Sequence, residues 1–353
     1  MKSLGVQVNP GVCGHHSRWF RVRAWVAAHV RGVMPAVGLF FIAPLVAEFL
    51  LGNMSITHLG LLVILAPVYG GGALLIRECV RRTGRGWPSI FLLALAYGII
   101  EEAFLLETLF NPNYLGLNLH LLKPAFLPLF GVGAWYTVFV LTLHTVWSIS
   151  VPIALVEASV PQRADSAWIG RLGIGIIAVV FALACVCMGT FSVRTDANHF
   201  VASTAQFAWS AVIVLMLGAS AFSLPRRRVA KIIGRVPDPR IVGICSLVVA
   251  SAFLLVPSAW GWWAVVAYLS LDTFTVLPIW IWSRRDGWGT IHRLSLAGGA
   301  AMAYAWHAFV QTPSLGAADG IARIGNLVFA VLAANLIAAG SRRSGDFDRQ
   351  QRC

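Results

Sequence analysis

Charged residues are scarce in this sequence. Asp, Glu, Lys and Arg together make up 12% of its 353 residues, whereas 58% are hydrophobic. A soluble domain carries roughly 25% charged residues. The scarcity excludes an ordinary water-soluble protein, because a soluble core of this size does not need so many apolar side chains. A protein whose outer surface faces lipid does need them, so the composition predicts an integral membrane protein.

The sequence also lacks the cysteine pattern of a disulfide framework or a metal site. Its six cysteines are scattered, and Cys185-x-Cys187 is one residue short of the spacing typical of zinc and redox pairs. No His-Glu-x-x-His segment is present, so we predict no metal and no other cofactor. No cleavable signal peptide and no soluble domain is evident.

Ten segments are apolar enough to cross a bilayer, which takes about 20 mostly apolar residues. They are residues 33–51, 59–79, 88–110, 132–158, 170–191, 204–223, 241–257, 260–282, 291–311 and 321–340. We therefore predict an all-α fold, a polytopic transmembrane helix bundle of about ten helices over residues 33–340. Residues 1–32 form a basic N-terminal segment and residues 341–353 a tail, and both are predicted to be cytoplasmic.

Basic residues alternate from one connection to the next. Of the 27 Lys and Arg residues, 24 fall in the two termini and every second connection, and 3 fall in the others. Connections rich in Lys and Arg stay in the cytoplasm, so the alternation predicts an even number of helices in the cell membrane. The net charge of +13 is thereby explained without nucleic acid. The basic loops are instead predicted to contact anionic lipid headgroups.

Ionisable side chains inside the apolar segments are the strongest functional signal. They are Glu48, Glu101, Glu102, His144, Asp272 and His307. Each costs about a few kcal/mol or more to bury in lipid, so such residues usually face the bundle interior and serve function. Counting about 1.5 Å per residue from the helix ends places all six in the middle-to-outer part of the bilayer. We predict a polar intramembrane site there, with Glu48 and Asp272 as candidate substrate- or ion-binding residues.

Several of these residues also have a structural interpretation. Glu48 and His307 are near enough to the outer interface for their side chains to reach it. His144 is also explained as a neutral core histidine bonded to a backbone carbonyl. Asp272 is also explained as the partner of a nearby Arg or Thr.

Small residues and prolines predict irregular helices near these groups. Gly70, Gly71 and Gly72 allow a close approach of another helix or a local break. Pro44, Pro67 and Pro152 interrupt their helices and free backbone carbonyls that can line a cavity.

The adjacent acids Glu101 and Glu102, followed by His144 and then His307, resemble a known pattern. It belongs to the CAAX-protease and bacteriocin-processing family of glutamate-dependent intramembrane proteases. Its motifs are a Glu-Glu-x-x-x-Arg helix, a Phe-x-x-x-His helix and a His-x-x-x-Asn/Asp helix. The resemblance implies that Glu101 activates a water, that Glu102 supports it, and that His144 and His307 are the second- and third-motif histidines. These four are the candidate catalytic residues.

The sequence departs from that pattern at three positions. Leu106, Val140 and Gln311 stand where the family has Arg, Phe and Asn or Asp, and five extra helices separate the second motif from the third. The stretch from Tyr69 to Pro161 is also similar to a broader group of uncharacterised bacterial membrane proteins, from which no activity follows.

A proton- or ion-coupled transporter is the competing prediction. Two halves of five helices would be inverted relative to each other, as in many transporters. The third helix would then correspond to the eighth, matching Glu101 and Glu102 with Asp272, and the fourth to the ninth, matching His144 with His307. A non-enzymatic assembly protein is a third class, and it accounts least well for two adjacent buried acids.

Overall fold

The computed structural model describes residues 32–116, 119–195, 199–226 and 232–350. Over these residues the chain forms ten helical rods and one short antiparallel hairpin, β1 (Phe126–Leu127) paired with β2 (Val132–Gly133). Eight of the rods are long and apolar enough to cross a membrane. The predicted all-α multi-pass membrane bundle is thereby confirmed, whereas the N-terminal segment lies outside the described residues.

The first four rods change helix type along their length. The first runs over Gly32–Leu50 and ends in η1 (Leu45–Leu50). The second comprises η2 (Ile56–Leu61), α2 (Leu62–Leu65), η3 (Ala66–Gly70) and α3 (Gly71–Arg82). The third is α4 (Trp87–Ile99) followed by η4 (Ile100–Leu105), and the fourth is α5 (Ala134–Leu143), η6 (His144–Ser150) and α6 (Val151–Ser159). Of these stretches, η1, η3, η4 and η6 are π-helical.

The other six rods are continuous α-helices. They are α7 (Arg171–Arg194), α8 (Thr204–Ser223), α9 (Pro239–Leu254), α10 (Trp262–Ser283), α11 (Thr290–His307) and α12 (Gly320–Gln350). Short 3-10 turns occur at η5 (Tyr114–Gly116), η7 (Pro161–Arg163) and η8 (Ser258–Trp260). The helix α12 continues ten residues beyond the predicted end of the last span at residue 340.

Three of the four π-helical stretches have a proline in or next to them. Pro44 immediately precedes η1, Pro67 lies within η3, and Pro152 follows η6 by two residues. Proline has no backbone N–H and disrupts the i→i−4 ladder, so a helix that continues past it must rearrange its hydrogen bonds. The predicted interruptions therefore take the form of π-helical turns, which occur frequently at functional sites.

The third helix ends earlier than predicted. The prediction extends it to residue 110, but the π-helical stretch ends at Leu105 and Glu107 has a left-handed backbone with φ of 57°. That conformation does not continue a right-handed helix. The Glu107 carboxylate accepts a hydrogen bond from the Ala202 N–H at 2.5 Å, which ties this turn to the segment before α8.

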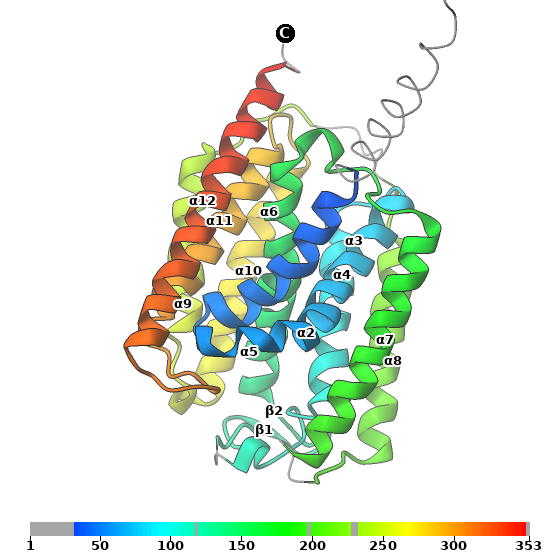
Figure 1. Cartoon of the computed structure of the whole chain (residues 1–353), viewed down its shortest axis with the longest axis vertical. Helices are drawn as coiled ribbons and strands as arrows, with labels where there is room; N and C mark the ends of the chain where they lie inside the picture. Colours follow the sequence, from blue (N-terminus) through cyan, green and yellow to red (C-terminus); the bar gives the residue numbers. More distant parts are fainter. Residues whose placement is uncertain (1–31, 117–118, 196–198, 227–231, 351–353) are drawn as a thin grey trace, which may run out of the picture.

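The helices differ strongly in how much of their surface neighbours cover. The core is formed mainly by the first four rods together with α11, whose small residues pack against α6 and α9. By contrast, few residues in the spans of α7, α8 and α10 are buried, so these helices present much of their surface to lipid. Both ends of the described chain lie at one end of the bundle and the β1–β2 hairpin lies at the other, here called the hairpin side (Figure 1).

Candidate functional site

The four π-helical stretches contribute the ionisable side chains of one buried cluster. Glu48 comes from η1, Glu101 and Glu102 from η4, and His144 from η6. Their residues are between 0% and 8% exposed. We call these four residues, with Tyr69 of η3, the acid–base cluster. Because a π turn adds one residue to the helical repeat, it changes which side chains face the bundle interior.

His144 lies between the two adjacent glutamates. Its Nε2 is 2.7 Å from Oε1 of Glu102, and its Nδ1 is 3.1 Å from Oε2 of Glu101. The Nδ1 atom is also 3.1 Å from the hydroxyl oxygen of Ser148, one helical turn further on. Both ring nitrogens therefore face oxygen atoms, so the imidazole ring has little freedom to turn.

Glu102 is fully engaged by its neighbours. In addition to His144, its carboxylate accepts hydrogen bonds from the hydroxyls of Thr108 and of Tyr136, the latter at 3.3 Å. One donor lies in the turn after η4, and the other two lie on the fourth rod, in α5 and η6. A carboxylate held in this way is suited to orienting a histidine ring.

Glu101 is positioned differently. Its residue is 0% exposed, and neither carboxylate oxygen has a hydrogen-bond partner of good geometry among the described residues. Its Oε2 atom lies 3.1 Å from Nδ1 of His144, and the hydroxyls of Tyr69 and Tyr97 lie close to the same carboxylate. Buried polar atoms are nearly always hydrogen-bonded, so a buried carboxylate without a well-formed hydrogen bond indicates a group kept available for another molecule.

Tyr69 extends the cluster to Glu48. Its hydroxyl donates to Oε1 of Glu48 at 2.6 Å, and its ring stacks on the His144 imidazole at 6.2 Å between centroids. The other Glu48 oxygen accepts from the Asn53 amide at 2.6 Å, and Asn53 in turn accepts from the Ser314 hydroxyl at 2.7 Å. Glu48 thus points into the bundle and is held by the loop before α12, rather than extending to the interface.

Glycines allow the helices to approach closely around the cluster. A Cβ atom on Gly98 would lie 3.0 Å from Cβ of His144, and one on Gly72 would lie 2.5 Å from the Tyr97 ring. A Cβ on Gly70 would collide with the backbone of Phe40 in the first helix. The glycine run in the second helix therefore allows neighbouring helices to approach it closely, as the sequence predicts.

Asp272 and His307 lie apart from the acid–base cluster. Asp272, in α10, accepts a hydrogen bond from the Thr142 hydroxyl at 3.1 Å. His307, the last residue of α11, contacts the Trp306 ring, and its Nδ1 has no hydrogen-bond partner among the described residues. Over the described part of the chain, no hydrogen bond or ion pair joins either residue to His144 or the glutamates. The structure thus brings together four of the six predicted site residues.

A second buried ionic cluster has no counterpart among the sequence predictions. Arg77 contacts Glu78 at 2.5 Å and Glu157 at 3.2 Å, and Arg81 binds the Glu157 carboxylate through two nitrogens at 2.8 and 2.7 Å. Glu78 also accepts backbone N–H bonds from Trp168 and Ile169.

This second cluster is a structural lock. The Arg77 guanidinium also donates to the carbonyls of Ala164 and Ser166 and lies 3.3 Å from the centre of the Trp168 ring. The second and fourth rods are thereby joined to the loop that follows the fourth. From the sequence, Glu157 is only an acid close enough to a helix end to need no function. Its spacing from Arg77 gives no sign that the two residues meet.

The geometry suits proton transfer without a metal ligand set. Among the described residues, no three His, Cys, Asp or Glu side chains are arranged to hold a metal ion. What the cluster does offer is one imidazole between two carboxylates in a low-dielectric interior. General acid–base partners need contacts of about 3 Å, and both glutamates meet that condition with His144.

Comparisons with known proteins give a family and no reaction. A model of an uncharacterized membrane protein family matches residues 38–341, which is most of the chain. No curated protein and no solved structure matches. The resemblance to the CAAX-protease family has no support in these matches, so it stays a prediction.

Proposed function

Because the chain belongs to this uncharacterized membrane protein family, which brings no reaction with it, we propose from its own side chains that the protein is an intramembrane hydrolase. In this proposal Glu101 is the general base, His144 exchanges protons with it, and Glu102 orients His144. Glu48 and Tyr69 form the polar wall on the other side of the histidine ring.

The observation that carries this proposal is the difference between the two adjacent glutamates. Glu102 is occupied by three donors, whereas both oxygens of Glu101 are without a hydrogen-bond partner of good geometry among the described residues. A general base must have an oxygen free to accept a proton from its reactant, and an orienting residue must not. The cluster contains one of each, and both contact the same imidazole.

The proposed reaction is the attack of a water molecule on an acyl carbon. The water proton moves to the Glu101 carboxylate while the water oxygen bonds to the carbon. Glu101 passes the proton to Nδ1 of His144, 3.1 Å away, which accepts it because the resting ring is neutral and carries its own proton on Nε2, bonded to Glu102. When the acyl C–N or C–O bond breaks, the proton moves from His144 to the leaving nitrogen or oxygen. The products are a carboxylic acid and an amine or alcohol, and the side chains return to their starting state.

Oxygen isotope labelling tests this reaction even while the substrate is unidentified. The purified protein, in bilayer discs, is incubated in ¹⁸O-water with a panel of transmembrane peptides, and the products are analysed by mass spectrometry. We expect new carboxylic acids that contain one ¹⁸O atom. Glu101→Gln should abolish them, because glutamine keeps the size of the side chain but does not accept the proton.

The matched control is Glu107→Gln. Glu107 is a buried acid only six residues further on, but it binds the Ala202 backbone rather than His144. This variant should still form the labelled products. Full activity of Glu101→Gln, or the absence of any labelled acid across the panel, would overturn the hydrolase proposal.

Proton-coupled transport is less well supported by the geometry. Its inverted halves require Asp272 and His307 to form a counterpart of the cluster. Instead, Asp272 binds Thr142 and His307 contacts Trp306. The two halves of the described chain are therefore chemically unequal at the positions that the repeat would match.

We also propose that the basic loops at the end of the bundle opposite the hairpin contact anionic lipid headgroups of the cell membrane. Arg235, Arg284 and Arg285 lie in two loops there that pair with each other, since the backbone of Ile232 bonds to that of Arg284 and the Arg285 side chain donates to the Arg235 carbonyl. Each Lys or Arg near an anionic surface contributes about 1 kcal/mol to binding.

A further inference from the structure

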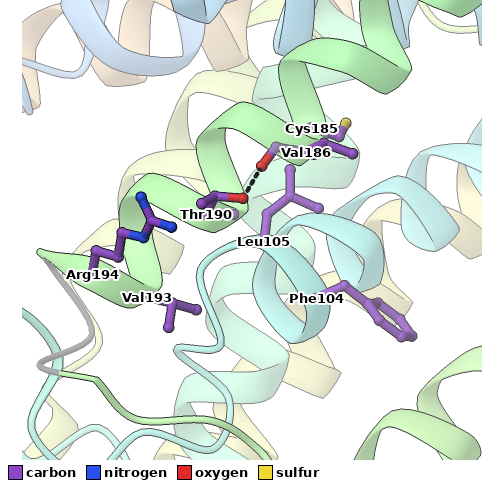
Figure 2. Close-up of a pocket in the computed structure, with 8 residues that line it drawn as sticks. Phe104, Leu105, Cys185, Val186, Thr190, Val193 and Arg194 are labelled. Carbon is purple, nitrogen blue, oxygen red and sulfur yellow. Dashed lines mark hydrogen bonds between the residues drawn. The ribbon is translucent and has the colours of Figure 1, made fainter.

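The stretch η4, which carries Glu101 and Glu102, also packs against α7. Its last residues, Phe104 and Leu105, form one wall of a groove of about 520 Å³. The helix α7 forms the other wall through Cys185, Val186, Gly189, Thr190, Val193 and Arg194 (Figure 2). Arg194 is the one charged residue among those lining the groove.

The groove faces the lipid side of α7. Val186 is 67% exposed, and no residue in the apolar window of α7 is buried. The Thr190 hydroxyl is occupied by the Val186 carbonyl at 2.7 Å, so it adds no free donor to the wall (Figure 2). Gly189 has no side chain to fill the groove, and a Cβ atom added there would lie 3.7 Å from the backbone of Leu105. In a bilayer, such an apolar surface is covered by an acyl chain or by another apolar helix.

The length of the groove matches one leaflet. Nine residues separate Cys185 from Arg194, a distance of about 14 Å along a helix. The hydrocarbon core of a bilayer is about 30 Å thick, so one leaflet is roughly half of that. Arg194 is the last residue of α7, on the hairpin side of the bundle. A helix of 24 residues is long enough to bring its last residue to the level of the lipid headgroups. The α7 wall of the groove therefore has a cationic side chain at one end, and its lining is apolar from there to about the depth of the bilayer centre.

We propose that this groove binds an anionic phospholipid of the leaflet on the hairpin side, with its phosphate paired to Arg194 and one chain against η4. Arg is suited to this pairing because its guanidinium binds phosphate oxygens bidentately. This lipid site goes beyond the hydrolase proposal and does not depend on it.

A second groove in the same protein provides an internal comparison. It has a volume of about 460 Å³ and lies between α9 and α10, with Leu255, Trp260 and Phe274 among its lining residues. No Lys or Arg lines it. Chains that occupy it should therefore show no preference for a lipid headgroup.

Native mass spectrometry of the detergent-solubilised full chain tests the proposal. Phosphatidylglycerol and phosphatidylcholine with the same acyl chains are added separately, and bound lipid is counted. We expect the first phosphatidylglycerol to bind about tenfold more tightly, a difference of about 1.4 kcal/mol. Arg194→Gln should lower that preference to what the basic loops at the other end of the bundle contribute, and Gly189→Leu, which fills the groove, should weaken binding of both lipids.

Two variants on the same helix are the matched controls. Arg171→Gln removes the arginine at the other end of α7, and Gly175→Leu adds the same side chain where nothing lies within 4 Å. Both should bind lipid like the unaltered protein, and so should Glu101→Gln, because the lipid site does not need the base. Failure of the hydrolase proposal would leave these results unchanged.

Three results would overturn the lipid site. Equal losses in Arg194→Gln and Arg171→Gln would indicate unspecific attraction to surface charge. Equally tight binding of glycerol phosphate, which has no acyl chain, would indicate an anion site without a groove. A dimer that Gly189→Leu converts to monomer would indicate that a second copy of the chain covers this face.

Discussion

Glu101 and Glu102 are neighbours in the sequence, yet their surroundings assign them different contributions to stability. Glu102→Gln replaces a carboxylate that accepts three hydrogen bonds, one of them from His144, with an amide. The single oxygen of the amide accepts only some of these bonds. Each hydrogen bond lost to a charged group costs about 1.5–3 kcal/mol. We expect a clear drop in the unfolding midpoint of Glu102→Gln in detergent. Glu101→Gln, which loses the contact with His144 but no hydrogen bond of good geometry, should melt much closer to the unaltered protein.

The measurement is a thermal or denaturant unfolding curve of each purified variant, followed by intrinsic tryptophan fluorescence. Glu107→Gln again serves as the comparison for an acid outside the cluster. Equal destabilisation by Glu101→Gln and Glu102→Gln would remove the distinction between base and orienting residue.

At the residue scale, the sequence is informative only where a side chain is out of place in lipid. Glu101, Glu102 and His144 stand out because ionisable groups are costly there, and they do meet. Tyr69 completes the cluster, and Asn53 holds Glu48 from the bend after η1. Neither contact is predictable, because the partner of an uncharged polar residue depends on tertiary packing. For the same reason, nothing in the sequence separates His307 and Asp272 from the residues that converge.

The helical elements near the acid–base cluster depend on glycine at one crossing. Gly70 lies against the backbone of Phe40, so Gly70→Ala must push the first two helices apart. Overpacking of this kind typically costs about 1–3 kcal/mol. We expect a lower unfolding midpoint and, because Tyr69 is the adjacent residue, a disturbed Glu48 contact.

Gly38→Ala is the matched control for that crossing. It adds the same methyl group to the first helix at a position with nothing within 4 Å. In a helix interior Ala is favoured over Gly by about 0.5–1 kcal/mol, so this variant should be as stable as the unaltered protein or slightly more so. Equal midpoints for Gly70→Ala and Gly38→Ala would contradict the close packing.

The ionic lock is the other prediction at the scale of elements. Arg77→Met removes one cation from a site where its partners Glu78 and Glu157 are 0–1% exposed. Glu157 then keeps only Arg81 as a cationic partner, and Glu78 keeps only Arg82 at 3.6 Å. Removing one partner of a buried ion pair costs about 3–5 kcal/mol. We expect a large loss of stability in the unfolding curve of this variant. Arg342→Gln, which removes an exposed arginine bonded only to its own helix, should cost almost nothing.

The helical elements themselves are predictable, but their irregularities are only partly so. Hydrophobic length locates all ten rods because a lipid environment demands about 20 apolar residues per crossing. The prolines indicate interruptions near residues 44, 67 and 152. No proline marks η4, so the π turn that presents Glu101 and Glu102 has no signal in the sequence. The left-handed turn at Glu107 is also unmarked, because a non-glycine residue gives no warning of a positive φ.

At the scale of the whole molecule, the distribution of basic residues and the hydropathy of the sequence are independent, and both predict an even number of membrane crossings. The structure places both ends of the described chain on one side of the bundle, as an even number of crossings requires (Figure 1). The charge alternation goes one step further and predicts that this side is cytoplasmic. That step concerns the orientation of the bundle in the cell, so it is tested on the protein in living cells.

Reporter fusions provide that experiment. A reporter that is active only in the cytoplasm should be active after Arg82, Arg163 and Arg285, because these positions lie in the connections rich in Lys and Arg. It should be inactive after Lys123 and Ser314, which lie in the connections that contain few Lys and Arg residues. A second reporter that is active only outside the cytoplasm should give the reverse pattern at every position. Two or more positions on the wrong side would contradict the ten-helix orientation.

Arg194 would then lie in the cytoplasmic leaflet, where anionic phospholipids are also present. The groove along α7 would keep its proposed ligand and change only the leaflet that supplies it.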